Sequence, residues 1–173
     1  MTIKEAMHIY FDKLNKLYKN KYNTLPTVSY VQKDESKMFI GDPDDDGEIQ
    51  WQPVSAKRVE IPGLCFELNE FFSSYYYWQL DGTLNEISYY FPHVTNMDEA
   101  IKVAKNALNE GKKLFPNSNN VIIATCTING ADDILLVYNQ YNKTIFYYDL
   151  EFEKVISCDL TLIDLLIQMN PLL

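Results

Sequence analysis

The sequence has little of what metal sites and many catalytic sites are built from. Its 173 residues include only three cysteines and two histidines. Cys65, Cys126 and Cys158 are odd in number and widely spaced, so they indicate neither a disulfide framework nor a zinc site. His8 and His93 lack metal-ligand spacing to each other or to a cysteine. We therefore expect no metal and no other cofactor.

Glycine and long apolar runs are also scarce. The chain has six glycines and contains no Walker loop, no dinucleotide-binding fingerprint and no nucleophile elbow of the G-x-S-x-G kind. No stretch approaches the roughly 20 apolar residues that a membrane helix needs, and the N-terminus lacks the apolar core of a secretion signal. These absences lead us to expect a cytoplasmic protein that is not an enzyme.

Basic residues are outnumbered by acidic ones. The chain carries 24 acidic and 15 basic side chains, which gives a formal net charge of -9. Such a surface repels nucleic-acid phosphates and anionic lipid head groups, but it accelerates encounter with a basic protein. We expect a basic protein partner, no nucleic acid, and membrane association only through a protein partner. Charge that serves solubility alone is the alternative interpretation.

Hydrophobic periodicity predicts four helices separated by β segments. The first helix begins after Thr2, which has capping-box spacing to Glu5, and it ends near Asn23. The other helices are expected over about 68–79, from Asn96 to Gly111, and over 162–169. Strands are expected at 38–40, 48–52, 87–91, 121–126, 134–138 and 144–148, the last three as a meander with a turn at 129–130. Residues 54–63 have the composition of a loop. Helices at both ends with β structure between them predict one α+β domain over 1–173.

The hairpin predicted over 38–53 has an unusually acidic tip. Its sequence, Asp42-Pro43-Asp44-Asp45-Asp46-Gly47, matches the first half of a calcium-binding loop. The twelfth position of such a loop requires a bidentate glutamate and here holds Pro53. We therefore interpret the segment as a charged turn. Its aspartates either take part in docking or are simply solvated.

Three segments resemble the Syd family of SecY-interacting proteins. They are 51–53 (Trp-Gln-Pro), the acidic and aromatic stretch 66–76, and 170–173 (Asn-Pro-Leu-Leu). The resemblance implies the SUKH fold, an α+β domain whose mixed, mainly antiparallel sheet is packed by N-terminal, middle and C-terminal helices. It also implies a non-catalytic function. Syd proteins bind the basic cytosolic loops of the SecY translocon subunit through an electronegative concave face, and related SUKH proteins are immunity proteins that neutralise a toxin.

We hypothesise that a concave sheet face captures a lysine- and arginine-rich loop. Carboxylates would bind the cations by charge-assisted hydrogen bonds, and aromatic rings would add cation–π contacts. The residues expected at this site are Trp51, Glu67, Glu70, Tyr76 and Asp81, together with Asp44 and Asp45 of the hairpin tip. With SecY as the partner, the protein would attach peripherally to the cytoplasmic face of the inner or plasma membrane.

Other interpretations remain open at this point. The partner could be a toxin encoded by a neighbouring gene. Paired carboxylates, such as Glu67 with Glu70 or Asp132 with Asp133, could act as in a glycosidase. The chain could also be a structural domain without a specific partner.

Overall fold

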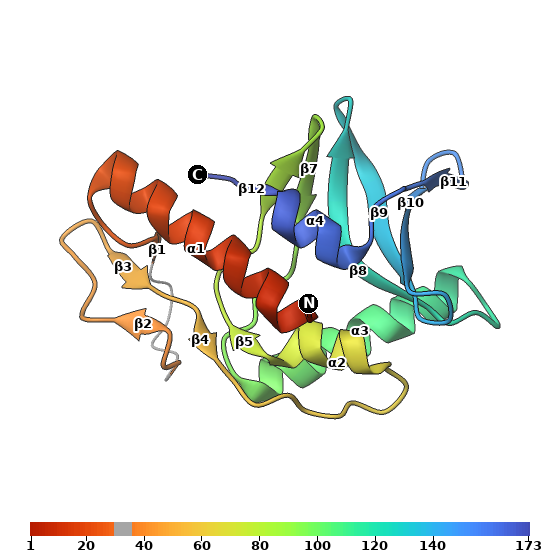
Figure 1. Cartoon of the computed structure of the whole chain (residues 1–173), viewed down its shortest axis with the longest axis horizontal. Helices are drawn as coiled ribbons and strands as arrows, with labels where there is room; N and C mark the ends of the chain where they lie inside the picture. Colours follow the sequence, from red (N-terminus) through yellow and green to blue (C-terminus); the bar gives the residue numbers. More distant parts are fainter. Residues whose placement is uncertain (30–35) are drawn as a thin grey trace.

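A computed structural model describes residues 1–29 and 36–173 (Figure 1). Its helices are α1 (Ile3–Tyr22), α2 (Phe66–Ser73), α3 (Met97–Leu114) and α4 (Leu162–Gln168). Its strands are β1 (Thr27–Ser29), β2 (Phe39–Ile40), β3 (Glu48–Trp51), β4 (Val54–Ser55), β5 (Tyr75–Tyr76), β6 (Gly82–Leu84), β7 (Ile87–Tyr90), β8 (Asn120–Ile128), β9 (Ala131–Asn139), β10 (Thr144–Asp149), β11 (Lys154–Ser157) and β12 (Asn170–Pro171). The combination of helices with antiparallel sheets is α+β, as predicted from the sequence.

A seven-stranded sheet forms the centre of the molecule, in the order β11-β10-β9-β8-β7-β6-β12 (Figure 1). The predicted meander is confirmed, because β8, β9 and β10 are neighbours and the turn residues Asn129 and Gly130 both have positive φ. The apolar strand β8 is central, as its sequence indicates. Every pairing described within 1–29 and 36–173 is antiparallel, so the mixed sheet implied by the resemblance is not found there.

Helix α1 begins at the predicted capping box. The Thr2 hydroxyl accepts a hydrogen bond from the Glu5 N–H at 3.1 Å, and the Glu5 carboxylate accepts one from the Thr2 N–H at 2.8 Å. The helix packs beside α4 in front of the sheet (Figure 1). Lys13 ties the two helices together, because its ammonium donates to the carbonyls of Ile167 and Met169 at the end of α4.

One hydrophobic cluster draws side chains from all four described helices and from the seven-stranded sheet. Phe11 of α1 is fully buried within it, with ring centroids 5.2 Å from Tyr75 and 5.5 Å from Tyr77. Phe71 and Phe72 of α2 are also fully buried, so they belong to the core. The ring contacts of Phe11 place α1 against the segment that follows α2.

The helix predicted over about 68–79 is wrong in its second half. Helix α2 ends at Ser73, and Tyr75–Tyr76 instead form β5, which pairs with β4 inside the predicted loop 54–63. The hydroxyls of Ser73 and Ser74 donate to backbone carbonyls one turn earlier, at Asn69 and Glu70. Such bonds compete with helix continuation, and the tyrosines that follow favour extended backbone.

Gly111 does not end helix α3, although the sequence predicted that it would. The helix continues to Leu114, and its backbone passes so close to β8 that a Cβ atom on Gly111 would lie 2.1 Å from the Asn120 carbonyl oxygen. The glycine therefore serves close packing of helix on strand.

Replacement of Gly111 by alanine tests this packing. Helix propensity alone predicts that Gly111→Ala stabilises the protein by about 1 kcal/mol. The contact with Asn120 predicts the opposite sign, a loss of about 3 kcal/mol from overpacking. Urea denaturation followed by circular dichroism measures the difference, with the exposed Asn109→Ala on the same helix as the control. An increase in stability for Gly111→Ala would show that α3 is free to move away from β8.

Candidate functional site

Two of the predicted acidic site residues, Glu67 and Glu70, are engaged within the fold. Glu67 forms an ion pair with Lys143, which lies in the turn between β9 and β10. Burial tends to raise the pKa of the Glu67 carboxyl, but the hydrogen bond from Lys143 and backbone hydrogen bonding outweigh it, and the net shift is downward. Glu70 is buried, and its Oε2 accepts from the Lys4 N–H at 3.2 Å in the first turn of α1. A carboxylate at that position stabilises the helix dipole.

Trp51 and Asp81 also hold the structure together. Trp51 is fully buried, so it offers no surface to a partner, and its assignment to the binding site is corrected to the core. The Oδ1 of Asp81 accepts from the Phe91 N–H at 3.1 Å. The backbone oxygen of Asp81 accepts from the Tyr10 hydroxyl at 2.6 Å. Tyr76 is half-buried in the two-stranded pairing of β4 with β5.

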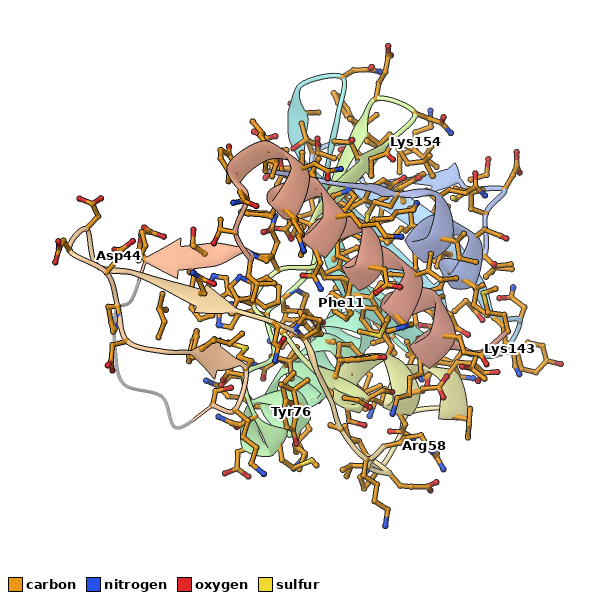
Figure 2. The ribbon with its side chains drawn as sticks, turned by 60° about the vertical axis from the view of Figure 1, so that its left-hand side comes forward. Phe11, Asp44, Arg58, Tyr76, Lys143 and Lys154 are labelled. Atoms are coloured by element: carbon orange, nitrogen blue, oxygen red, sulfur yellow. The ribbon has the colours of Figure 1, made fainter. Side chains whose placement is uncertain are left out.

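Asp44 and Asp45 are exposed at the tip of the β2–β3 hairpin, which forms as predicted. The Oδ1 of Asp44 accepts from the N–H groups of Asp46 at 3.0 Å and Glu48 at 2.8 Å, which fixes the shape of the turn. Figure 2 shows Asp44 on a projection far from Tyr76 and Lys143. The seven predicted residues therefore do not converge on one concave face.

A different acidic surface runs along β3. Ile49 and Trp51 point inward from this strand and are buried, so the alternating side chains point outward. We call this surface the acidic strip. It consists of Asp42, Asp44, Asp45, Asp46 and Glu48 at the tip, then Gln50 and Gln52, and finally Asp12 and Glu5 on α1. Within the described residues, no tip aspartate is paired with a lysine or arginine.

The acidic strip ends at a hollow of about 250 Å³ beside α1, which we call the α1 hollow. It is lined by His8, Phe11, Asp12 and Asn15 of α1, by Gln52, Pro53 and Ser55, and by Tyr75 of β5. In Figure 2, Phe11 lies near the middle of the molecule, where β3 approaches α1. A neighbouring hollow of about 400 Å³ shares His8 and Tyr75 and extends to Lys4, Glu5 and Ile9.

Polar groups and aromatic rings meet in the α1 hollow. His8 Nε2 lies 3.7 Å from Asp12 Oδ2, one turn along the helix. The Oδ1 of Asn15 is buried and has no hydrogen-bond partner among the described residues. Burial, and after it the charge of Asp12, raise the pKa of the Tyr75 hydroxyl. The hollow thus combines one carboxylate with amide and hydroxyl groups, beside the buried rings of Phe11 and Tyr75.

A third hollow, of about 500 Å³, lies between α3 and strands β7 and β8 and has a mainly apolar lining that includes Val103, Ala107 and Ile122. None of the seven predicted residues lines any of these three hollows. In the part of the chain that the structure describes, no three His, Cys, Asp or Glu side chains are grouped so that they could hold a metal ion. None of the helices there has the length and apolarity that crossing a membrane requires.

Comparison with known proteins adds no assignment. No protein-family model matches the chain, and no curated protein matches it. The resemblance to the Syd family therefore stays a prediction from the three sequence segments.

The half-buried Asp81 carboxyl gives stability a measurable pH dependence. Burial raises its pKa to about 6, although the hydrogen bond from Phe91 opposes the shift. Because the folded protein holds this proton more tightly than the unfolded chain, the contribution of Asp81 to stability falls as pH rises from about 4 to about 6. Asp81→Asn keeps an oxygen acceptor for Phe91 and carries no charge.

We expect Asp81→Asn to match the wild type near pH 4 and to exceed it by about 1–2 kcal/mol above pH 7, a range reduced for solvent screening of a half-buried group. Urea titrations at several pH values measure the free energy of unfolding of both proteins. Subtracting one value from the other removes the contribution of all other titratable groups. If the difference in unfolding free energy stayed constant across this pH range, the Asp81 carboxyl would have the same pKa in the folded and the unfolded protein.

Proposed function

We propose that the protein is a non-catalytic binding module that captures a basic segment of another protein on the acidic strip. The observation that carries the proposal is the hairpin tip, where Asp42, Asp44, Asp45 and Asp46 lie exposed within five residues and form no ion pair with a lysine or arginine of the described residues. Figure 2 shows Asp44 on a projection. Lysine or arginine would be the natural counter-charge for such a surface. The hydrogen bonds to Asp44 Oδ1 pre-form the turn, so little conformational entropy is lost when a partner binds.

The strength of exposed ion pairs sets how much the hairpin tip can contribute to binding. An exposed ion pair contributes roughly 0–1 kcal/mol, so the aspartates provide modest affinity even when they act together. Their larger effect is on association, since long-range attraction raises on-rates by about 10–10³-fold at low salt. A basic partner would therefore arrive quickly and bind in a salt-dependent way.

Enzymatic use of the paired carboxylates finds less support. Glu67 is held by Lys143, and Glu70 accepts a backbone hydrogen bond from Lys4. Asp132 accepts from the Thr127 hydroxyl at 2.7 Å on an exposed part of the meander. Catalytic carboxylates need a substrate site between them, and none of these pairs lines a hollow described above.

The resemblance to the Syd family suggests the basic cytosolic loops of SecY as the partner. In that case the protein acts at the cytoplasmic face of the membrane and attaches there only through the translocon. The unusually acidic tip departs from the Syd pattern and favours a second candidate, a basic toxin that the protein would neutralise as an immunity protein.

Charge-neutral variants of the tip test the proposal. Asp45→Asn/Asp46→Asn removes two charges from the acidic strip. Asp132→Asn/Asp133→Asn removes two charges from the meander and serves as the matched control. With SecY in lipid nanodiscs, or with a toxin encoded beside the gene, we expect the tip variant to bind about tenfold more weakly at 50 mM salt. The control variant should bind as the wild type does, and 500 mM salt should remove most of the difference.

The same titrations separate the other possibilities. If the tip variant and the control variant lost the same affinity, net charge alone would attract the partner. The acidic strip would then not be the binding surface. Affinity that does not change with salt would contradict electrostatic capture altogether. Binding of SecY but not of the toxin, or the reverse, decides between the two candidate partners.

A further inference from the structure

We propose that the α1 hollow binds a single arginine side chain of the captured segment. This inference rests on the proposed function, because it assigns a position for one residue of the basic partner. The α1 hollow adjoins the acidic strip, since Gln52 and Asp12 belong to both. None of the seven site residues predicted from the sequence lines this hollow.

The size of the α1 hollow suits one side chain. Its volume is about 250 Å³, which lies below the range of about 300–1,000 Å³ typical of sites for drug-sized ligands. A side chain that enters from a segment lying on the acidic strip needs no larger space.

The polar groups of the hollow are suited to a cation with several donors. The Asp12 carboxylate is about half exposed, with a relative side-chain exposure of 53%, and His8 is its neighbour on the helix. The lining amides of Asn15 and Gln52 and the hydroxyl of Ser55 supply further oxygen acceptors. The Asn15 Oδ1 lacks a partner among the described residues, so a rotation of this amide that meets a donor would relieve an unsatisfied group.

One aromatic residue of the hollow favours a guanidinium group. Tyr75 lines the hollow and keeps 7% of its surface exposed, whereas Phe11, whose ring packs edge-to-face against Tyr75 at 5.2 Å, is fully buried and offers no free ring face. Tyr75 already attracts a cation, because the Lys4 ammonium lies 5.7 Å from its ring centroid. Arginine stacks on aromatic rings and presents five N–H donors in a plane, whereas lysine presents a compact point charge.

The chain itself does not supply the occupant. Its single arginine, Arg58, lies 4.2 Å from the Phe66 ring centroid and forms an ion pair with Glu60. In Figure 2, Arg58 lies at the bottom of the molecule, away from Phe11. The arginine must therefore come from a partner.

The length of the acidic strip sets the spacing in the partner. Strand geometry separates Glu48 from Gln52 by about 13 Å, which an extended segment spans in about four residues. An arginine in the α1 hollow would then follow, or precede, the basic residues at the tip by about four to six positions. This spacing defines a probe without knowledge of the natural partner.

The experiment uses three fluorescein-labelled peptides with the full-length protein. Each peptide has three lysines at one end and, five positions away, arginine, lysine or the neutral isostere citrulline. By fluorescence anisotropy at 50 mM salt, we expect the arginine peptide to bind about tenfold more tightly than the citrulline peptide and about threefold more tightly than the lysine peptide. Asp12→Asn should reduce the advantage of arginine over citrulline to less than twofold.

Matched variants isolate the hollow from the rest of the surface. Asp132→Asn removes one charge elsewhere and should leave the preference for arginine intact, while Asp45→Asn/Asp46→Asn should weaken all three peptides to a similar degree. Gln52→Ala, at an exposed side chain, should lower the preference for arginine and serves as a second variant if Asp12→Asn does not fold. The NMR signals of the Asn15 side-chain amide should shift with the arginine peptide and not with the citrulline peptide.

Three failures are distinguishable. If the three peptides bind with equal affinity, the arginine site is overturned and capture by the acidic strip stands. If no peptide binds at 50 mM salt, the proposed function is overturned together with the arginine site. A preference for arginine that survives both Asp12→Asn and Gln52→Ala would place the guanidinium elsewhere and likewise overturn the assignment.

Discussion

The position of the candidate surface depends on the packing of Phe11 against Tyr75 and Tyr77. These rings hold α1 against the segment after α2, and that segment carries β5. Because β5 pairs with β4, the same contact fixes where β3 and its hairpin leave the body of the protein. The α1 hollow forms above this cluster, so its walls come from three separate parts of the chain that one buried contact aligns.

Acidic side chains serve two different purposes in this fold. Glu70 and Asp81 accept hydrogen bonds from backbone N–H groups, and Glu67 is matched by Lys143. Glu67 and Glu70 therefore have partners within the protein, whereas burial makes the Asp81 carboxylate costly to ionise. The aspartates of the hairpin tip, by contrast, have no basic partner within the described residues, so their charge acts on whatever approaches. The net charge of the chain does not distinguish carboxylates with partners in the fold from carboxylates without them. The distinction requires the contacts of the folded structure.

The parts of the fold that follow from local signals could be predicted from the sequence. The capping box at Thr2, the meander around Asn129 and the hairpin at residues 38–53 each depend on neighbouring residues. The predicted helix beyond Ser73 failed because aromatic residues such as Tyr75 are compatible with either a helix or a strand, and the distant strand β4 decided between them. Trp51 was misplaced although a local signal was present. It shares the apolar face of β3 with Ile49 and alternates with the polar Glu48 and Gln50, a pattern that indicates burial.

The candidate site was less predictable than the fold. Sequence correctly placed Asp44 and Asp45 on an exposed turn, yet it could not show that Glu67 meets a lysine 76 residues away or that Glu70 meets a backbone N–H 66 residues away. The sequence spacing of His8 and Asp12, four residues apart on a predicted helix, shows that they share one helix face. The approach of Gln52 and Ser55 to that face depends on long-range strand pairing and leaves no local pattern.

In the proposed capture of a basic segment, the hairpin tip and the α1 hollow would contribute in different ways. Exposed charges attract any basic segment and lose much of their strength within about 8 Å at physiological ionic strength, so a tip of aspartates gives speed with little selectivity. Selectivity requires groups that are costly to leave unmatched, which means a concave site with few, partly desolvated polar atoms. The α1 hollow joins such atoms to the acidic strip through Gln52 and Asp12. The proposed arginine site would therefore supply the selectivity of the proposed capture, because the Asp12 carboxylate and an Asn15 amide oxygen that has no partner among the described residues line the same small volume beside α1.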